Sequence, residues 1–354
     1  MRDVAVVSFA QSEPMSRAVV DANEVEMLMP VTRAALDRVG LTIRDIGFTC
    51  SGSTDYLAGV TFSFVQTLDG VGPWPPIQES HVEMDGAWAL YEAWVKLQMG
   101  DIDTAFVYAY SKSSPGQLPM VLTRQLDPYS EGPLWPDSIS LAALQARALL
   151  DSGKATEADF AQVAARSRSN ALANNPHAQL RWDRPADELL GEEYLIAPLR
   201  KHDCPPITDG AVAVVLAAED RARELVDRPA WIRGIDHRID PMALGRRDLT
   251  TSPSAALAAQ RAGVADGPVD IAELHAPFTH QELILREAIG LSRDVDVNLS
   301  GGPLAANPMM AAGLARIGEA ASRIIAGDAG RAVAHATQGP ALQQNLVCVL
   351  EGKD

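Results

Sequence analysis

Aromatic residues and long hydrophobic runs are both scarce in this sequence. Phe, Trp and Tyr make up 5% of the 354 residues, whereas hydrophobic residues of all kinds make up 47%. Small side chains must therefore fill much of the interior, which suits closely packed helices and sheets. No apolar run approaches the roughly eighteen residues that a membrane-spanning helix needs, and the first residues lack the apolar core and cleavage site of a signal peptide. We expect no membrane association.

Cysteine and basic residues are also few. The three cysteines, Cys50, Cys204 and Cys348, lie far apart and lack the spacing of a metal site. This usage predicts a reduced, cytoplasmic protein. Lys and Arg number 30 against 46 Asp and Glu, which gives a formal net charge of −16. Because phosphate backbones are bound by clustered cations, this balance argues against nucleic acid as a partner.

Strand-like and helix-like segments alternate along the chain, which indicates an α/β protein. Residues 1–225 contain a strand, a helix, a strand, an extended segment, an almost uncharged helix over 84–100 and further strands. Residues 226–354 repeat this order, so we expect two similar halves, as the length also suggests. Residues from about 112 to 203 interrupt the first half with turns, two helices and a polar segment. Long insertions of this kind often cover a binding site.

Charged residues precede the uncharged helix of the first half. The stretch ESHVEMDGAWAL (79–90) brings Glu83 and Asp85 close to the start of that helix. A carboxylate there has a simple structural explanation, since it stabilises the helix dipole by about 0.3–1 kcal/mol. The second explanation is a functional site at the mouth of a buried helix.

Two further segments combine turns with buried strands. KHDCPPITDGAVAVVL (201–216) is a proline-rich turn followed by Asp-Gly and a continuously apolar strand. AELHAPFTHQE (272–282) places His275 at the end of a strand, where α/β folds usually position their chemistry. His280 follows five residues later, a spacing that suits neither one helix face nor a third ligand. We therefore expect no metal site.

A third segment, NLSGGPLAANPMMAAG (298–313), has two glycines before a predicted helix. Backbone N–H groups exposed by such glycines can bind an anion. This segment resembles the thiolase motif N-x-S-G-G-x-x-x-x-G-H-P-x-G-A-T-G. Residues 201–216 resemble C-x-P-x-x-D-G-A-A-A, and 272–282 are similar to Glu-x-His-Asp-Cys-Phe, both from sterol-carrier thiolases. The chain thus resembles the sterol-carrier or lipid-transfer type of the thiolase superfamily, which includes thiolase-like proteins and aldolases of steroid side-chain breakdown.

This resemblance implies a thiolase-like fold of two similar α/β halves in a five-layer α-β-α-β-α arrangement. It implies acyl-CoA as the ligand, with a coenzyme A thioester as substrate and no tightly bound cofactor. It also implies a homodimer, or a heterodimer with a second thiolase-like subunit. By the same resemblance we expect a small OB-fold/zinc-ribbon partner that binds acyl-CoA.

The departures from the family pattern affect its covalent chemistry. Thiolases carry a nucleophilic cysteine at the N-terminus of the buried helix, where the helix dipole favours the thiolate. Aligning the family's C-x-x-G-x-x-A with EMDGAWA places Glu83 on that cysteine. The catalytic histidine falls on Asn307, and the turn HATQGPALQQN around Gly339 lacks the second cysteine. His275 alone remains of the catalytic set, so we expect no acyl-cysteine.

Retro-aldol cleavage of a 3-hydroxyacyl-CoA needs no nucleophile, because a base removes the β-hydroxyl proton and hydrogen-bond donors stabilise the thioester enolate. We therefore expect a subunit of an acyl-CoA lyase, with steroid side chains as possible substrates. The predicted catalytic residues are Glu83 as the base and His275 and Asn307 as donors. The predicted substrate-binding residues are Asp85, Gly301, Gly302 and Gly339.

Two other interpretations stay open. The steroid side-chain aldolases of this group are associated with a catalytic tyrosine in the loop that His275 occupies, and no tyrosine follows Tyr194 here. The chain would then be a non-catalytic subunit that pairs with a thiolase-like protein carrying the missing residues. The second interpretation is a carrier of acyl-CoA or lipid without catalysis.

Overall fold

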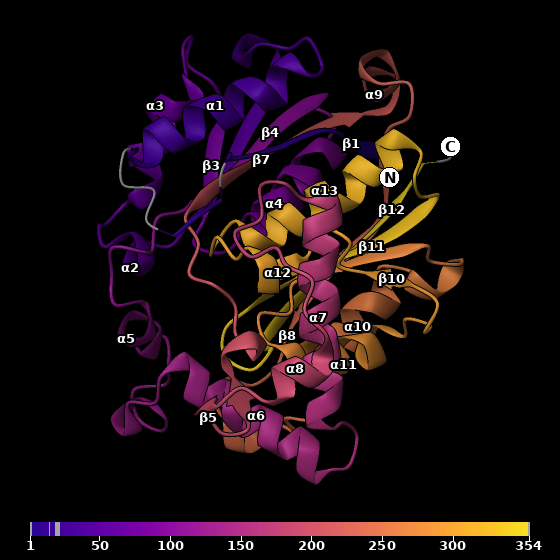
Figure 1. Ribbon diagram of the computed structural model, residues 1–354. Helices are drawn as coiled ribbons and strands as arrows, with labels where there is room; N and C mark the ends of the chain where they lie inside the picture. Colours follow the sequence, from indigo (N-terminus) through magenta and orange to yellow (C-terminus); the bar gives the residue numbers. More distant parts are fainter. Residues whose placement is uncertain (1, 14, 18–21, 353–354) are drawn as a thin grey trace.

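The computed structural model describes residues 2–13, 15–17 and 22–352 (Figure 1). Ten of its strands form one mixed sheet in the order β10-β9-β11-β12-β8-β1-β7-β4-β2-β3. The strands of the first half are β1 (Val4–Gln11), β2 (Phe48–Gly52), β3 (Glu79–Val82), β4 (Thr104–Ser111) and β7 (Gly210–Ala218). Those of the second half are β8 (Ala230–Ile239), β9 (Ile271–Leu274), β10 (Asp296–Val297), β11 (Arg331–Gln338) and β12 (Gln344–Glu351). A separate hairpin pairs β5 (Tyr194–Ile196) with β6 (Leu199–Arg200).

The two halves have the same strand order. In chain order, the second strand of each half pairs in parallel with the third and fourth strands, and the fifth lies antiparallel between the fourth and the first. The halves meet where β1 pairs with β8, through Ala5 opposite Trp231 and Val6 opposite Ala230. This repeat confirms the predicted arrangement of two similar halves. The expected division after residue 225 lies between α9 and β8.

The helices form three layers around these strands (Figure 1). The outer face of the first half is covered by α1 (Glu24–Asp37), α3 (Ser63–Val71) and α9 (Glu219–Leu225). The outer face of the second half is covered by α10 (Pro253–Arg261) and α11 (Thr279–Ile289). Between the halves lie α4 (Gly86–Gln98) and α13 (Ala312–Ala326), with the short helix α12 (Gly302–Ala305) before α13. This confirms the five-layer thiolase-like fold.

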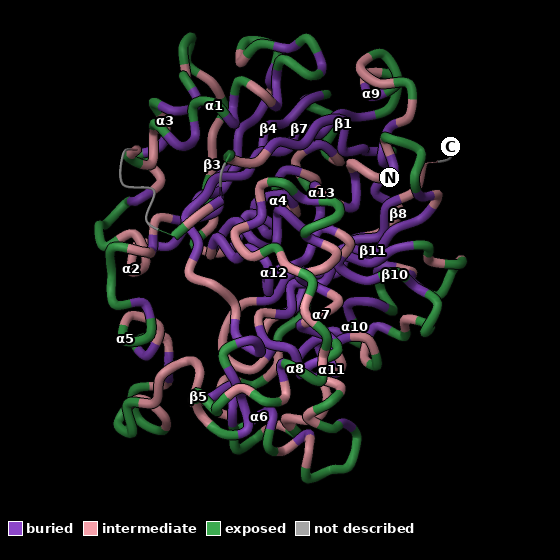
Figure 2. The backbone as a smooth tube through the Cα atoms, viewed as in Figure 1, coloured by how far each residue is buried: buried purple, intermediate pink, exposed green. Residues whose placement is uncertain are grey.

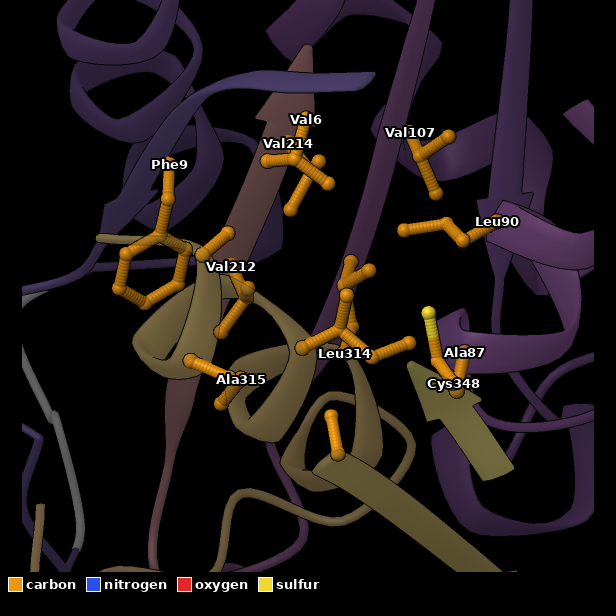
Figure 3. Close-up of a cluster of buried hydrophobic side chains, with 14 of the residues drawn as sticks. Val6, Phe9, Ala87, Leu90, Val107, Val212, Val214, Leu314, Ala315 and Cys348 are labelled. Atoms are coloured by element: carbon orange, nitrogen blue, oxygen red, sulfur yellow. The ribbon is translucent and has the colours of Figure 1, made fainter. Parts of the chain in front are cut away.

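Alternation along the strands explains the layers. Val4 and Val6 of β1 face the middle layer, whereas Ala5 and Val7 face the outer helices of the first half. Successive strand residues point to opposite faces, so a strand buried on both sides is apolar over most of its length, as β1 is apart from Ser8 and Gln11. In Figure 3 the middle-layer cluster includes Val6, Phe9, Ala87, Leu90, Leu314, Ala315 and Cys348.

Most of the insertion lies in the lower part of the molecule in Figure 1, and α7 (Glu157–Asn174) runs from there to the middle, where it contacts α12. The other helices of the insertion are α5 (Leu118–Thr123), α6 (Ser138–Asp151) and α8 (Ala186–Leu190). The short helix α2 (Asp55–Ala58) precedes the insertion in the sequence and contacts α5. Exposed segments lie around the periphery, including the turns near α1, α3, α5, α6 and α9, and the central strands and helices are buried (Figure 2). Within the described ranges, no helix has both the length and the apolar character to cross a membrane.

Candidate active site

A cavity of about 210 Å³ lies where the insertion meets both halves. Its walls come from the start of α4, the loop after β9, the segment before α13 and the turn between β11 and β12. Four of the residues predicted from the sequence line it together, namely Asp85, His275, Asn307 and Gly339. The structure thus brings residues that lie up to about 250 positions apart in the sequence to one site, because both buried helices begin there.

Asp85 is the N-cap of α4, and its carboxylate also caps α13. Oδ1 accepts hydrogen bonds from the Ala87 N–H at 2.8 Å and the Leu314 N–H at 3.0 Å. Oδ2 accepts from the Gly313 N–H at 2.8 Å. Aspartate is a favoured N-cap because it satisfies helix N–H groups that have no intrahelical partner. One carboxylate therefore joins the starts of the two buried helices.

Burial raises the pKa of Asp85 to about 6, although the three N–H donors and the charge of Arg316 act in the opposite direction. Removing a carboxylate from water disfavours its charged form, and this desolvation is the largest effect here. At neutral pH Asp85 is predominantly ionised, and it takes up a proton under mildly acidic conditions. A carboxylate with this pKa suits a general base.

His275 follows β9 directly and is fixed by β11. Its backbone N–H donates to the His335 carbonyl at 3.1 Å, and its Nδ1 accepts from the Thr337 N–H at 3.4 Å. An accepting Nδ1 assigns the ring proton to Nε2. Burial lowers the pKa of His275 to about 3, so the ring is neutral. It provides a hydrogen-bond donor without a charge.

Asn307 lies beside His275 in the segment before α13. Its backbone N–H donates to the Thr208 hydroxyl at 3.1 Å, and that hydroxyl donates to Gln179 Oε1 at 2.8 Å. These bonds connect Asn307 to the proline-rich turn of residues 201–209. The Asn307 side chain is buried, and its Oδ1 has no hydrogen-bond partner of good geometry among the described residues. The amide lies within reach of the His275 side chain, so the two polar groups form one pair at the cavity.

Cys204 also lines the cavity, which the sequence analysis did not anticipate. Its thiol donates to the Arg200 carbonyl at 3.6 Å, and burial raises the pKa of Cys204 to about 12. The thiolate is the nucleophilic form of cysteine, so this thiol is inert at neutral pH. Cys50 and Cys348 are buried in the core between the halves.

The structure does not bring Glu83 to the cavity. Glu83 is exposed, and its Oε1 accepts a hydrogen bond from the Asp55 N–H at 2.5 Å, at the start of α2. Two residues further along, Asp85 is only 1% exposed. The chain turns between β3 and α4, and the N-cap residue, rather than Glu83, directs its carboxylate to the helix N–H groups.

Gly301 and Gly302 also lie outside the cavity lining. A Cβ at Gly301 would lie 2.5 Å from the Ala171 Cβ, and one at Gly302 would lie 2.7 Å from Asn298 Nδ2. Both glycines have left-handed backbone angles, with φ of 89° and 59°. Close packing and backbone conformation explain these glycines without a bound anion.

A buried ion pair supports the Ser-Gly-Gly segment. Arg316 donates to Glu273 Oε2 at 2.8 Å, and the Ser300 N–H donates to Glu273 Oε1 at 2.9 Å. The Ser300 hydroxyl also donates to Glu273 Oε2 at 2.6 Å. A fully hydrogen-bonded buried network of this kind fixes the loop that precedes Asn307. The glutamate of the Glu-x-His segment is thus structural, while its histidine lines the cavity. No cluster of metal-ligating side chains occurs in the part of the chain that the structure describes.

The outer wall of the cavity is apolar and comes largely from the insertion. Among the described lining residues there is no Lys or Arg. The apolar lining side chains of the insertion are Leu118, Pro119, Leu122, Leu126, Pro136, Ile139, Leu141 and Ala142. The insertion also contributes Gln125 and Ser138, but its lining is mostly apolar and favours an uncharged, apolar group.

Three relatives have similar sequences. An acetyl-CoA acetyltransferase of Methanothermobacter thermautotrophicus is 26% identical over 362 residues, covering 94% of this chain and 93% of the relative. The benzoylsuccinyl-CoA thiolase subunit BbsB of Thauera aromatica is 30% identical, covering 42% of this chain and 40% of the relative. A 17-hydroxy-3-oxo-4-pregnene-20-carboxyl-CoA lyase of Mycobacterium tuberculosis is 31% identical, covering 44% of each. No family model matches the chain.

Two solved structures share the whole fold. The Ltp2-ChsH2(DUF35) aldolase has a TM-score of 0.82 at 21% identity, covering 99% of this chain and 98% of that one. Human mitochondrial 3-ketoacyl-CoA thiolase has a TM-score of 0.77 at 15% identity, covering 100% and 99%. The fold is therefore that of a thiolase-like protein. The similarity to the acetyl-CoA acetyltransferase over nearly the whole chain supports a place in the thiolase superfamily, and the two solved structures show its fold.

Proposed function

We propose that this chain is a catalytic subunit of an acyl-CoA lyase that cleaves 3-hydroxyacyl-CoA thioesters by a retro-aldol reaction. The observation that carries the proposal is the pairing of one ionised carboxylate, Asp85, with a neutral histidine donor, His275, in a single cavity. The names of two similar proteins, a lyase and an aldolase, agree with this class of reaction.

The reaction needs a base and an enolate-stabilising donor. Asp85 takes the proton of the β-hydroxyl group, and the β-carbon becomes a carbonyl carbon as the Cα–Cβ bond breaks. The bonding electrons form the enolate of the acyl-CoA product. His275 Nε2–H donates to the enolate oxygen, and Asn307 provides a second polar contact. The proton held by Asp85 then moves to Cα, which gives the acyl-CoA and a ketone or aldehyde.

We assign the base to Asp85 rather than to Glu83. Both carboxylates precede α4, but only Asp85 lines the cavity, and Glu83 holds the start of α2 instead. Acyl transfer through a thiolate is the competing chemistry of this fold. The high pKa of Cys204 and the core positions of Cys50 and Cys348 argue against a cysteine nucleophile.

A non-catalytic role as one subunit of a heteromeric acyl-CoA enzyme is the second candidate. It is favoured by the similarity to BbsB, whose name identifies it as a subunit of a thiolase. The aldolase that shares the fold is a complex with a DUF35 protein. We therefore propose a thiolase-like dimer, with itself or with a second thiolase-like chain, joined by a small OB-fold/zinc-ribbon protein. Cytoplasmic location is part of the same proposal.

The test is to purify the chain, alone and with thiolase-like and zinc-ribbon partners, and to supply matched 3-hydroxyacyl-CoA and 3-ketoacyl-CoA substrates. The proposal predicts a ketone or aldehyde and a shortened acyl-CoA from the hydroxyacyl ester, without free coenzyme A. Replacing His275 by Ala should slow this cleavage by about 10²-fold, as loss of an oxyanion donor does. Cleavage of the ketoacyl ester that depends on free coenzyme A would contradict the retro-aldol proposal. Turnover that survives His275→Ala in the partner complex would assign the chemistry to the other subunit.

A further inference from the structure

The turn that joins β11 to β12 has an unusual backbone. It runs from Gly339 to Gln343, and three of its residues have left-handed angles: Gly339 at φ 78°, Ala341 at φ 52° and Leu342 at φ 59°. Glycine adopts such angles readily, whereas Ala and Leu rarely do. Consecutive residues of this kind persist only where surrounding contacts impose them. Contacts with neighbouring residues must therefore hold this turn in its conformation.

Arg247, from the loop between β8 and α10, holds this turn. Its Nη1 donates to the Ala341 carbonyl at 3.1 Å and its Nη2 donates to the Pro340 carbonyl at 3.0 Å. A planar guanidinium can bind two successive carbonyls at once, which a single ammonium group cannot do with the same geometry. Arg247 is half-buried, and burial lowers its pKa. On the β12 side, Asn345 Nδ2 donates to the Leu342 carbonyl at 2.8 Å.

Leu342 is buried in a hydrophobic core cluster, but Pro340 and Ala341 are only partly buried, and side chains do not fill the space behind these two residues. A second cavity of about 190 Å³ lies there and is lined by residues of the 240–253 loop together with Ala341. Arg246 and Arg247 both border this second cavity. Ala341 also lines the first cavity, so the turn separates the two cavities. Leu342 packs into the core, the Asp240 N–H donates to the Gln343 carbonyl at 2.8 Å, and the two hydrogen bonds from Arg247 hold the Pro340–Ala341 segment between the two cavities.

The turn forms part of the substrate cavity. Its residues Gly339, Pro340, Ala341 and Leu342 all line the cavity. The preceding residue, Gln338, accepts a hydrogen bond at its Oε1 from the Asp85 N–H at 3.0 Å. A displacement of the turn would therefore move an apolar wall of the cavity, whereas the contact with Asp85 comes from the last residue of β11.

We propose that Arg247 is a positioning residue that sets the shape of the acyl-binding cavity by fixing the β11–β12 turn. Arg247 is not among the residues that line that cavity, and it acts through the carbonyls of Pro340 and Ala341. Its effect falls on binding of the acyl group more than on the chemical step, because the turn forms the wall while His275 is fixed separately by β11. The identity of the ligand as an acyl-CoA rests on the proposed function.

The test compares Arg247→Gln, Arg247→Lys and the control Arg246→Gln. Arg246 borders the second cavity and is exposed, so its variant removes a neighbouring charge and leaves both carbonyl contacts intact. Hydrogen–deuterium exchange is measured for residues 338–344. We expect at least tenfold faster exchange in the turn for Arg247→Gln, an intermediate increase for Arg247→Lys and no change for Arg246→Gln.

Binding and turnover provide the second measurement. With a non-cleavable 3-hydroxyacyl-CoA analogue, Arg247→Gln should weaken binding about tenfold, and with substrate it should raise KM with less than a threefold change in kcat. Unchanged exchange and affinity would overturn the proposal, and so would faster exchange throughout the sheet, which indicates a merely structural residue. Exchange and analogue binding need no turnover. If the wild type and all variants are inactive, the proposed function is wrong. Hydrogen–deuterium exchange and analogue binding then still test the role of Arg247.

Discussion

The two buried helices of the middle layer occupy matching places in the two halves, but their N-termini differ. Helix α4 begins with its own capping aspartate, Asp85, whereas α13 begins after Ala311, which offers no side-chain cap. The N–H groups of Gly313 and Leu314 are satisfied by Asp85 instead. A duplicated fold has thus become asymmetric, with one carboxylate in the first half capping the helices of both.

The segments next to these two helices also carry different kinds of polar side chain. The first half supplies the acidic group, and the second half supplies neutral polar groups, His275 and Asn307. In the proposed reaction the acidic group is the base and the neutral groups are the hydrogen-bond donors, so each half contributes one of the two roles. Because both halves contribute side chains, the site lies at the contact between them.

Replacing the shared carboxylate should have the largest effect. In Asp85→Asn the base is lost, and we expect kcat/KM for retro-aldol cleavage to fall by about 10²–10⁴-fold, the usual contribution of a general base. Glu83→Gln is the matched control, since it neutralises a carboxylate two residues away that does not line the cavity. It should change kcat/KM less than threefold. The reverse ranking of the two variants would restore Glu83 as the base.

Separating the two helices should destabilise the fold. A Cβ at Gly313 would lie 2.5 Å from Asp85 Oδ1 and 2.5 Å from the Ala336 Cβ. We expect Gly313→Ala to lower the free energy of unfolding by about 2–4 kcal/mol, because overpacking and a displaced buried carboxylate both add cost. Gly116→Ala is the control, since its Cβ would make only an ordinary contact of 3.6 Å with the Ser113 carbonyl. Denaturant unfolding of both variants measures the difference.

Some of this arrangement could be predicted from the sequence. Alternating strands and helices, with three family-like segments in order, fix the α/β class and the two halves because buried strands and turns tolerate few residue types. Asp85 as an N-cap was also predictable, since Asp directly before a helix that starts at Gly86 matches the capping preference. The alignment instead selected Glu83 by its distance from Gly86. Distance along the chain does not determine which side chain turns inward at the entry to a helix.

Other features depend on tertiary packing that no local pattern reports. Cys204 lies in the segment 201–216, which resembles a thiolase motif. Its place in the cavity follows from how the insertion folds over the second half. The Arg247 contacts join residues 94 and 93 positions apart, and the sequence around Arg247 resembles any polar loop. Gly301 and Gly302 match an anion-binding pattern, yet close neighbours already account for them.

The pH dependence of stability should report the titration of the carboxylate that caps both helices. The pKa of Asp85 is raised from 3.8 to about 6 in the folded protein, so the folded state binds more protons than the unfolded state between these values. Stability therefore falls as pH rises from about 4 to 6. The full cost is about 3 kcal/mol at 1.36 kcal/mol per pKa unit. Asp85→Asn should lack this component, and thermal unfolding of both proteins from pH 4 to 8 measures it. Identical pH profiles would contradict the raised pKa.

The smallest effect is expected at Cys204, where thiolases with a cysteine nucleophile would show the largest. Its thiol is buried with a pKa of about 12 and lines the cavity without activation. Cys204→Ala should change kcat/KM less than threefold and lower the free energy of unfolding by about 1 kcal/mol, as removal of a small buried group does. Mass spectrometry after incubation with substrate should detect no acylated protein. Loss of activity in Cys204→Ala together with an acyl adduct in the wild type would show that the first half supplies a nucleophile as well as the acidic group, and the roles assigned to the two halves would have to be revised.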